Sequence, residues 1–133
     1  MNTWSNKRKM TIETNRFRLR VEDKIVGYQK QIHNSIFYSK DEYAWNGAKI
    51  EFQLKDKFSG VYDINRRAIY AEDILEFKDW KNCNFGLVLF DEVLSEFQIM
   101  DLSTEELVID SFKDISNLPT FVFKSYSFIQ PEV

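Results

Sequence analysis

The sequence predicts a mainly β fold of antiparallel strands, and three observations support that prediction. Several short segments alternate apolar and polar residues with the two-residue period of a half-buried strand. Helix signals are few, and the chain lacks the strand-helix-strand rhythm of a parallel sheet. Aromatic residues make up 16% of the 133 residues, twelve of them Phe, which supplies ample apolar surface for a core. We therefore expect an antiparallel barrel or sandwich.

The first expected strand covers residues 16–21. Its alternation places three apolar side chains on one face and three basic ones on the other, namely Phe17, Leu19 and Val21 against Arg16, Arg18 and Arg20. A polar turn at 22–24 and a returning strand at 25–28 complete a hairpin. Residues 33–47 then form a long surface connection around a short strand, and 50–54 is expected to be another half-buried strand.

The second half of the chain contains the next expected strands, at 68–70 and 73–79. Residues 86–100 fit two strands joined by a turn at Asp91-Glu92, although the spacing of four apolar residues also matches a helix: Leu87, Phe90, Leu94 and Phe97. We favour the two strands. The final strand alternates over 121–129 and ends near Pro131.

One short helix is predicted as an alternative at 103–106. Ser103-Thr104-Glu105-Glu106 has the form of a capping box, in which the first and last side chains bond each other's backbone N–H groups. The β-branched residues that follow, in Leu107-Val108-Ile109, favour a strand instead.

The length of the chain fits one domain. We predict a flexible polar arm at 1–15 and a single β-rich domain at 16–133. Cys83 is the only cysteine, so no internal disulfide can form, and no apolar run approaches the roughly 18–20 residues that span a bilayer. We therefore expect a cytoplasmic protein without membrane contact.

Charge is unevenly distributed along the sequence. Residues 1–67 hold 14 Lys/Arg against 8 Asp/Glu, a net charge of +6, whereas residues 68–133 hold 4 against 13, a net charge of −9. This asymmetry favours nucleic acid on one side or head-to-tail association of copies. The alternative is that folding mixes the two halves and leaves ordinary solvated faces.

Residues that could perform catalysis or bind a cofactor or a metal do not form any recognisable motif. His33 is the only histidine and Cys83 the only thiol, which is too few for a triad or a zinc site. The segment that begins at Asp63 has Ala68 and Ile74 where a calcium loop needs Gly and Glu. We predict no catalytic residues, no cofactor and no metal, and hence no enzyme.

Six basic residues are the candidate contacts to nucleic acid. A row of cations that follows the phosphates is the usual start of non-specific binding. The candidates are the basic triplet and the arginines of the first strand: Lys7, Arg8, Lys9, Arg16, Arg18 and Arg20. Conversely, the acidic stretch from Glu72 to Asp114 suits an inhibitor that mimics a nucleic-acid surface.

Residues 58–77 resemble the signature of the YopX family of phage and prophage proteins. The family's usual form is Phe-Thr-Gly-Leu, then Lys-Asp-x-Asn-Gly, then Ile-Tyr-Glu-Gly-Asp-Ile-Val, and this chain has FSGVYDINRRAIYAEDILEF. Weaker similarities are Phe17-Arg18, Val26-Gly27-Tyr28, the segment 86–91 and the end of the chain from Tyr126 to Glu132. The chain differs at two signature glycines, which are Arg66 and Glu72 here. We expect the turn at Asn65 to lose backbone freedom and the start of the strand at Asp73 to avoid positive φ.

The resemblance implies a divergent member of the family, with a small SH3-like barrel in the C-terminal half and a mobile-element origin. It implies no activity and no catalytic residues. We expect a non-enzymatic protein that binds a host or phage macromolecule, most simply a protein, in the cytoplasm of a bacterial host. The alternatives are a nucleic-acid-associated accessory protein that uses the basic N-terminal strand, and the acidic inhibitor. Homo-oligomers are a further expectation, because exposed strand edges favour them.

Overall fold

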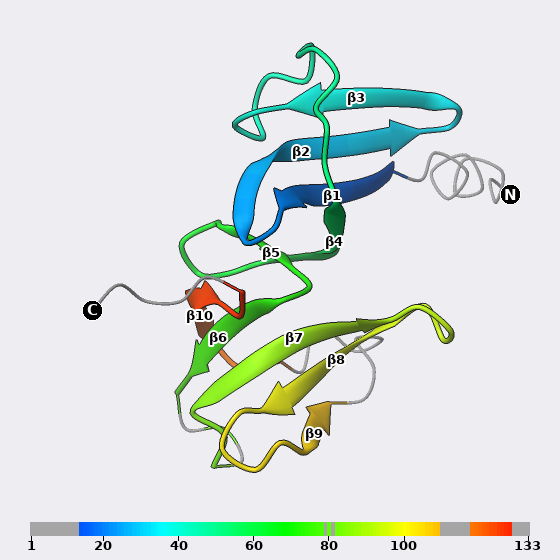
Figure 1. Ribbon diagram of the computed structural model, residues 1–133. Coiled ribbons are helices and arrows are strands. Elements are labelled where there is room, and N and C mark those ends of the chain that lie inside the picture. Colours follow the sequence, from blue (N-terminus) through cyan, green and yellow to red (C-terminus); the bar gives the residue numbers. More distant parts are fainter. Residues whose placement is uncertain (1–13, 79, 81, 110–117, 129–133) are drawn as a thin grey trace, which may run out of the picture. The chain divides into compact units, whose positions relative to one another are not determined.

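The structure is a computed structural model that describes residues 14–78, 80, 82–109 and 118–128. It is mainly β, and every pairing between its strands is antiparallel, as the sequence predicted (Figure 1). The chain forms two compact units, residues 1–55 and residues 56–133. We call them the N-terminal unit and the C-terminal unit. Neither a change of composition nor a turn signal in the sequence indicates the boundary between Lys55 and Asp56.

The N-terminal unit is a meander of three strands: β1 (Thr14–Val21), β2 (Lys24–Ile32) and β3 (Ser35–Ser39). The predicted hairpin of the first two strands is confirmed. Its register joins Thr14 to Ile32 and Asn15 to Gln31, so these two N-terminal residues belong to the strand and not to the predicted arm. Glu22 and His33, in the two tight turns, have φ values of 56° and 55°.

The simple alternation predicted for β1 does not survive in the structure. The register of β1 against β2 shifts between Leu19 and Arg20, which marks a β-bulge or irregularity. Three successive residues, Arg18, Leu19 and Arg20, are 2%, 0% and 8% exposed. The extra residue of this shift is Val26, in β2, and the burial of three successive β1 residues shows that both faces of β1 are covered here, so two-residue periodicity cannot separate an apolar face from a basic one.

The strand expected at 50–54 is wrong, because β4 begins only at Leu54 and continues to Tyr62. The segment before it is held by bonds to the β1–β2 hairpin. Gln53 donates its backbone N–H to Arg20 O at 2.9 Å, and its side-chain oxygen accepts the backbone N–H of Glu22 at 2.9 Å. Alternation of Ile50, Phe52 and Leu54 thus reflects a half-buried connection.

The C-terminal unit contains β4 from Asp56 onward, the short strand β5 (Ala68–Tyr70) and a sheet of five strands. That sheet has the order β10-β6-β7-β8-β9, from β6 (Asp73–Phe77), β7 (Phe85–Asp91), β8 (Glu96–Asp101), β9 (Leu107–Ile109) and β10 (Phe121–Tyr126). The predicted strands at 68–70 and 73–79 are present, although β6 already ends at Phe77. The end of the expected last strand, Ile129, lies outside the described residues.

The expected SH3-like barrel is not closed. β9 and β10 are the two edges of the five-stranded sheet, and no pairing joins them within the described part of the chain. The sheet instead packs one face into a core of buried residues that includes Leu75, Phe77, Val88, Ile99 and Phe121. Packing of Phe77 against Trp80 and Phe121, at centroid distances of 4.5 and 5.9 Å, closes one end of this core.

The segment 86–100 is the predicted pair of strands, β7 and β8, with a turn whose N–H groups at Val93 and Leu94 bond the Asp91 carboxylate. The alternative short helix at 103–106 is wrong, since the described residues contain no helix. Asp101 organises this segment instead: its carboxylate accepts the N–H and hydroxyl of Ser103, and its carbonyl accepts Glu105 N–H at 2.7 Å. The chain can then start β9, as the β-branched residues indicated.

Two strand edges are occupied by nearby loops. At β10, Phe123 donates its backbone N–H to the Asp63 carboxylate at 2.9 Å, and Phe121 O accepts Ile64 N–H at 3.4 Å. At β3, Tyr38 O accepts Gly47 N–H at 3.0 Å. Covered edges of this kind leave fewer free backbone N–H and C=O groups with which a strand of another chain could pair.

Candidate functional site

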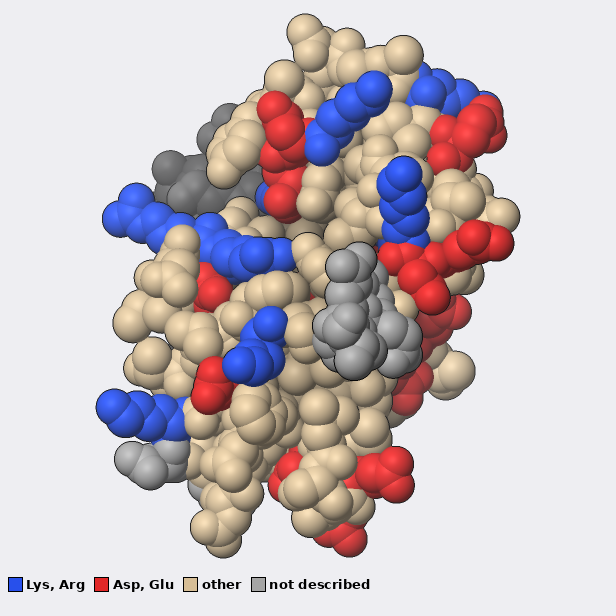
Figure 2. Space-filling model, turned by 60° about the vertical axis from the view of Figure 1, so that its left-hand side comes forward, with Lys and Arg blue, Asp and Glu red and all other residues tan. Residues whose placement is uncertain are grey.

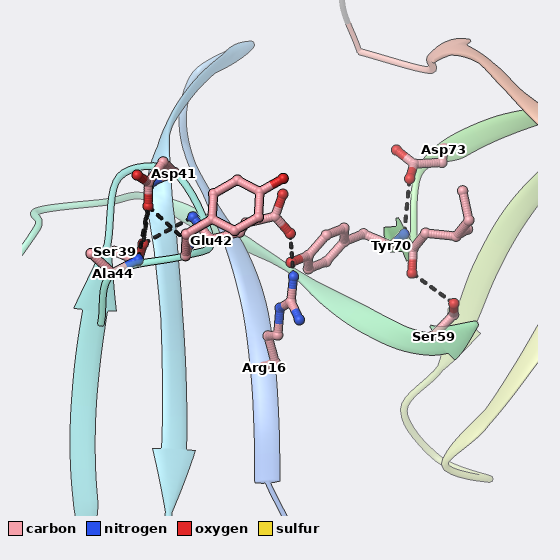
Figure 3. A network of polar contacts seen from close by, with 10 residues as sticks. Arg16, Ser39, Asp41, Glu42, Ala44, Ser59, Tyr70 and Asp73 are labelled. Atoms are coloured by element: carbon pink, nitrogen blue, oxygen red, sulfur yellow. Dashed lines mark hydrogen bonds and ion pairs between the residues drawn. The ribbon is translucent and has the colours of Figure 1, made fainter. Parts of the chain in front are cut away.

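The predicted nucleic-acid contacts are not gathered on one exposed row. Lys7, Arg8 and Lys9 lie outside the described residues. Arg16 is half-buried and forms an ion pair with Glu42 from the loop after β3 (Figure 3). Its guanidinium carbon also lies 5.7 Å from the centroid of the Trp45 ring, on which Lys30 packs at 4.4 Å.

Burial withdraws the other two arginines from solvent. Arg18 and Arg20 are 2% and 8% exposed, which leaves little of either residue for a phosphate. On the face that Figure 2 shows, Lys and Arg side chains form several separate groups with Asp and Glu side chains among them. Among the described residues that this view draws, no continuous basic track of the kind that nucleic-acid backbones follow is seen.

The charge asymmetry of the sequence follows the boundary between the two compact units. The N-terminal unit contains 11 Lys/Arg against 6 Asp/Glu, a net charge of +5. The C-terminal unit contains 7 against 15, a net charge of −8. Opposite charge is therefore a property of each folded unit and not only of the linear sequence.

The loop after β3 is built around the Asp41 carboxylate. One of its oxygens accepts the backbone N–H groups of Tyr43 and Ala44 at 2.9 and 3.1 Å, and the Ser39 hydroxyl at 3.0 Å (Figure 3). The bonds from Tyr43 and Ala44, followed by that from Ser39, lower the pKa of Asp41 below its usual range. These bonds fix the loop that carries Glu42 and Trp45.

The two aspartates of the YopX-like signature hold the backbone. Asp63 is 7% exposed, and its carboxylate accepts N–H groups from Asn65, Arg67 and Phe123 at 2.9, 2.8 and 2.9 Å. Asp73 is 1% exposed and accepts Tyr70 N–H at 2.8 Å (Figure 3). Because buried carboxylates need such donors, these bonds stabilise both aspartates in the fold.

Ser59 and the two glycine substitutions complete this segment. The Ser59 hydroxyl donates to Ile69 O at 2.6 Å (Figure 3). Arg66 and Glu72, which replace signature glycines, have φ values of 65° and 76°. The expectation that this chain avoids positive φ before Asp73 is therefore wrong: the turn keeps the left-handed conformation and a side chain tolerates it.

His33 and Cys83 lie in different units and in different environments. His33 is exposed in a turn, as expected. Cys83 is 1% exposed and directs its thiol to Phe85 O at 3.6 Å. Burial, with a smaller contribution from the charge of Asp101, raises the pKa of the Cys83 thiol, which keeps it in its unreactive neutral form. In the part of the chain that the structure describes, no three His, Cys, Asp or Glu side chains form a group that could hold a metal ion.

Two depressions at one end of the C-terminal sheet share Asp101 and Ser103. One is about 250 Å³ and is lined by Asn84, Phe85 and Leu102 as well, and the other is about 630 Å³ and extends to Val108. Both are open to solvent. The carboxylate oxygen of Asp101, a residue that lines both depressions, accepts the two Ser103 bonds and is therefore already used within its own turn.

An arginine stacks on aromatic rings at the surface of the C-terminal unit. The guanidinium carbon of Arg67 lies 3.6 Å from the centroid of the Phe123 ring, and its Nη2 donates to the Tyr126 hydroxyl at 2.6 Å. Tyr126 contacts Phe123 edge to face at 4.9 Å and stacks on Phe128 at 5.1 Å. We call Arg67, Phe123, Tyr126 and Phe128 the arginine-aromatic cluster.

A β-bulge assembles this cluster. Simple alternation along 121–129 places Phe123 and Tyr126 on opposite faces of the strand, which was the sequence prediction. The register of β10 against β6 shifts between Phe123 and Ser125. One extra residue reverses the alternation, so Tyr126 comes to the side of Phe123 and their rings touch.

The cluster could not be predicted from the sequence because its residues lie far apart along the chain and the residue pattern does not reveal the bulge. Arg67 and Tyr126 are 59 residues apart. Two-residue periodicity predicted the strand correctly, but it assigned the rings of Phe123 and Tyr126 to opposite faces. The one available signal was the density of aromatic residues in 121–128, which contains Phe121, Phe123, Tyr126 and Phe128.

None of the described elements is a helix with the length and apolar character needed to cross a membrane. Compared with protein-family models, with curated proteins and with solved structures, the chain matches none of them.

Proposed function

We propose that this protein is a non-enzymatic protein of phage or prophage type that acts in the cytoplasm of a bacterial host by binding a protein of the host or the phage. The observation that carries the binding role is the arginine-aromatic cluster. Arg and Tyr are enriched among the residues that dominate protein-protein affinity, and here both are held in place before any partner arrives.

The rigidity of the cluster supports the same role. Phe123 packs against the hydrophobic core of the C-terminal unit, so the surface that it forms with Arg67 is anchored in the fold. A side chain that is already ordered loses less conformational entropy when a partner binds. Exposed apolar residues near in sequence, Tyr62 at 50% and Ile64 at 65%, add surface of the kind that interfaces bury.

The phage-type assignment is supported by the backbone of the signature segment. Gly60, Arg66 and Glu72 occupy the three signature positions that are glycine in the YopX pattern. All three have positive φ, at 84°, 65° and 76°. A glycine is preferred where φ is positive, so the pattern of the family fits the turns of this chain even where the glycine itself is replaced.

A nucleic-acid-associated accessory protein is the second candidate, and it now depends on Lys7, Arg8 and Lys9. Arg18 and Arg20 are buried and Arg16 is paired with Glu42. A third candidate, an acidic inhibitor that mimics a nucleic-acid surface, is favoured by the net charge of −8 of the C-terminal unit.

The test is affinity capture with the full chain from a lysate of infected bacteria, followed by binding of the purified partner. We expect a protein partner that survives nuclease treatment and binds in a two-component measurement. Oligonucleotides, single- and double-stranded, are tested in parallel at low salt. Salt-dependent binding that is lost when Lys7, Arg8 and Lys9 are replaced by Gln, with no protein captured, would overturn the proposal in favour of the accessory protein. Mass measurement of the free chain shows whether copies associate.

A further inference from the structure

We propose that Arg67 is the anchor of a peptide-binding site, and that its ligand is a carboxylate side chain flanked by apolar residues in a protein partner. This inference rests on the proposed protein-binding function and names the surface and the chemistry that perform it. It begins from what the Arg67 guanidinium contacts within the chain.

The side chain of Arg67 contacts aromatic rings, although the unit to which it belongs is rich in carboxylates. The C-terminal unit has more than twice as many Asp/Glu as Lys/Arg, yet no described carboxylate forms an ion pair with Arg67. Its side-chain contacts within the described residues are the rings of Phe123 and Tyr126 and the Tyr126 hydroxyl. The chain therefore holds the guanidinium by stacking and by one hydrogen bond.

This arrangement leaves hydrogen-bonding capacity directed to the outside. A guanidinium has five N–H donors, and one bond, from Nη2 to Tyr126, is recorded for Arg67 within the described residues. Arg67 is an exposed residue, so its remaining donors can reach a ligand. Two parallel N–H donors match the two oxygens of a carboxylate, and stacking on Phe123 fixes the plane in which they lie.

The surroundings favour a protein carboxylate over a nucleic-acid phosphate. A nucleic-acid strand brings a charge at every nucleotide to a unit whose net charge is −8, and the repulsion accumulates along the strand. A single carboxylate with apolar neighbours brings one charge only. The exposed side chain of Ile64, three residues before Arg67, and the rings of the cluster provide apolar surface for those neighbours.

The variants are chosen so that charge and geometry are separated. Arg67→Gln removes the charge and the planar pair of parallel N–H donors, whereas Arg67→Lys keeps the charge and removes only the planar pair. Arg66→Gln is the matched control, because Arg66 is the adjacent exposed arginine and loses the same charge. The Arg67 backbone bonds to Asp63, at 2.8 and 2.9 Å, involve no side-chain atom of Arg67, so these variants should keep the turn. Thermal unfolding of each variant checks this.

The experiment measures binding of the full chain to an array of random nine-residue peptides that all carry a central Asp, each paired with its Asn counterpart. We expect bound peptides to have apolar residues beside the Asp, and Asp→Asn to weaken binding about tenfold or more. Arg67→Gln should weaken it as much, Arg67→Lys nearly as much, and Arg66→Gln less than about twofold.

Three outcomes would overturn the inference. Peptide binding that ignores Asp→Asn or Arg67→Gln removes Arg67 as the anchor and leaves the proposed protein-binding function standing. Arg67-dependent binding of a twenty-residue oligothymidylate, stronger than that of any peptide, assigns the site to phosphate. No binding to the array, together with no captured protein partner, removes the anchor and the proposed function together.

Discussion

The two compact units of the chain bury different kinds of side chain. Among the described residues of the N-terminal unit the fully buried set is mostly polar: Arg18, Gln29 and Ser39 are at most 4% exposed, Arg20 is 8% exposed, and Leu19 is the buried apolar residue that accompanies them. The C-terminal unit buries a continuous apolar cluster around Leu75, Phe77, Val88 and Ile99, and it also buries Ser59 and four aspartates, among them Asp63 and Asp73.

This difference shows two ways of holding a small β structure. The N-terminal meander depends on directional bonds, such as those of the Asp41 loop, and each buried polar group there needs its partner. The C-terminal sheet depends on packing, which is proportional to the apolar area removed from water. Changes of volume should therefore be felt mainly in the C-terminal unit, whereas changes of hydrogen bonding should be felt in both units.

The largest expected effect is loss of core volume. Leu75→Ala should lower the free energy of unfolding by about 2–5 kcal/mol, because Leu75 is 1% exposed and surrounded by apolar residues that cannot fill the cavity fully. Leu19→Ala should cost less, about 2 kcal/mol, because the buried residues that accompany Leu19 are mostly polar and it loses fewer apolar contacts. Urea unfolding of both variants checks this. A larger loss for Leu19→Ala than for Leu75→Ala would break the comparison.

Overpacking of the C-terminal core should follow. A Cβ on Gly86 would lie 2.6 Å from Ile99 Cγ2 and 2.9 Å from Phe77 Cε2. Gly86→Ala is therefore expected to cost about 1–3 kcal/mol, measured as a shift of the urea midpoint. Gly47→Ala in the N-terminal unit is the control, because its Cβ meets Tyr38 O at 3.1 Å and should cost less. Equal losses would show that the two units resist added volume alike.

Backbone conformation gives a smaller effect of opposite sign. Arg66→Gly should stabilise the protein by up to about 1 kcal/mol, because glycine adopts φ near 65° without strain. Glu72→Gly should gain less, since Glu72 also accepts the Ser127 hydroxyl at 2.7 Å. Glu22→Gly, at a φ of 56°, makes the same change in the N-terminal unit. Thermal unfolding ranks the three, and a loss at Arg66 would contradict the argument.

Acid should release the bonds of the Asp41 loop in the N-terminal unit. The folded pKa of Asp41 is lowered, so its bonds contribute stability at pH values above the unfolded pKa, and that contribution is lost as the pH falls through the folded pKa. Chemical shifts of the Tyr43 and Ala44 amides should follow this titration, while those of the C-terminal core should not follow it. Asp41→Asn should abolish the titration, and its persistence in that variant would assign it to another group.

The fold class and most strands could be predicted from the sequence, because alternation reports half-buried strands directly. The hairpin of β1 and β2, the pair β7 and β8, and β5 and β6 were all found in this way. Bulges were invisible: the shift after Phe123 reverses the faces that alternation assigns to β10, and the shift beside Leu19 places an extra residue, Val26, in β2. The short helix failed because the Ser103 N–H bonds the Asp101 carboxylate and the Glu106 N–H bonds the Thr104 hydroxyl, so neither bond of the capping box forms.

The candidate site could not be predicted for a related reason. It joins a turn residue, Arg67, to a strand whose outward face depends on a bulge. The residue pattern of the turn does not indicate this contact, and the residue pattern of the strand does not indicate the bulge. The basic row was predicted from alternation, but the burial of Arg18 and Arg20 depends on tertiary packing. Sequence reasoning thus found the cations and assigned them to the wrong surroundings.

The covered edge of β10 affects how long this strand is exposed to other chains during folding. The Asp63 carboxylate that bonds Phe123 N–H comes from a turn closed by bonds between residues 63 and 67, a contact that forms over a few residues. The turn itself is local, but its bond to Phe123 joins residues 60 apart in the sequence, so the edge of β10 stays open until these distant segments meet. We therefore expect this edge, and not the short-range hairpins of the meander, to set the concentration at which refolding aggregates.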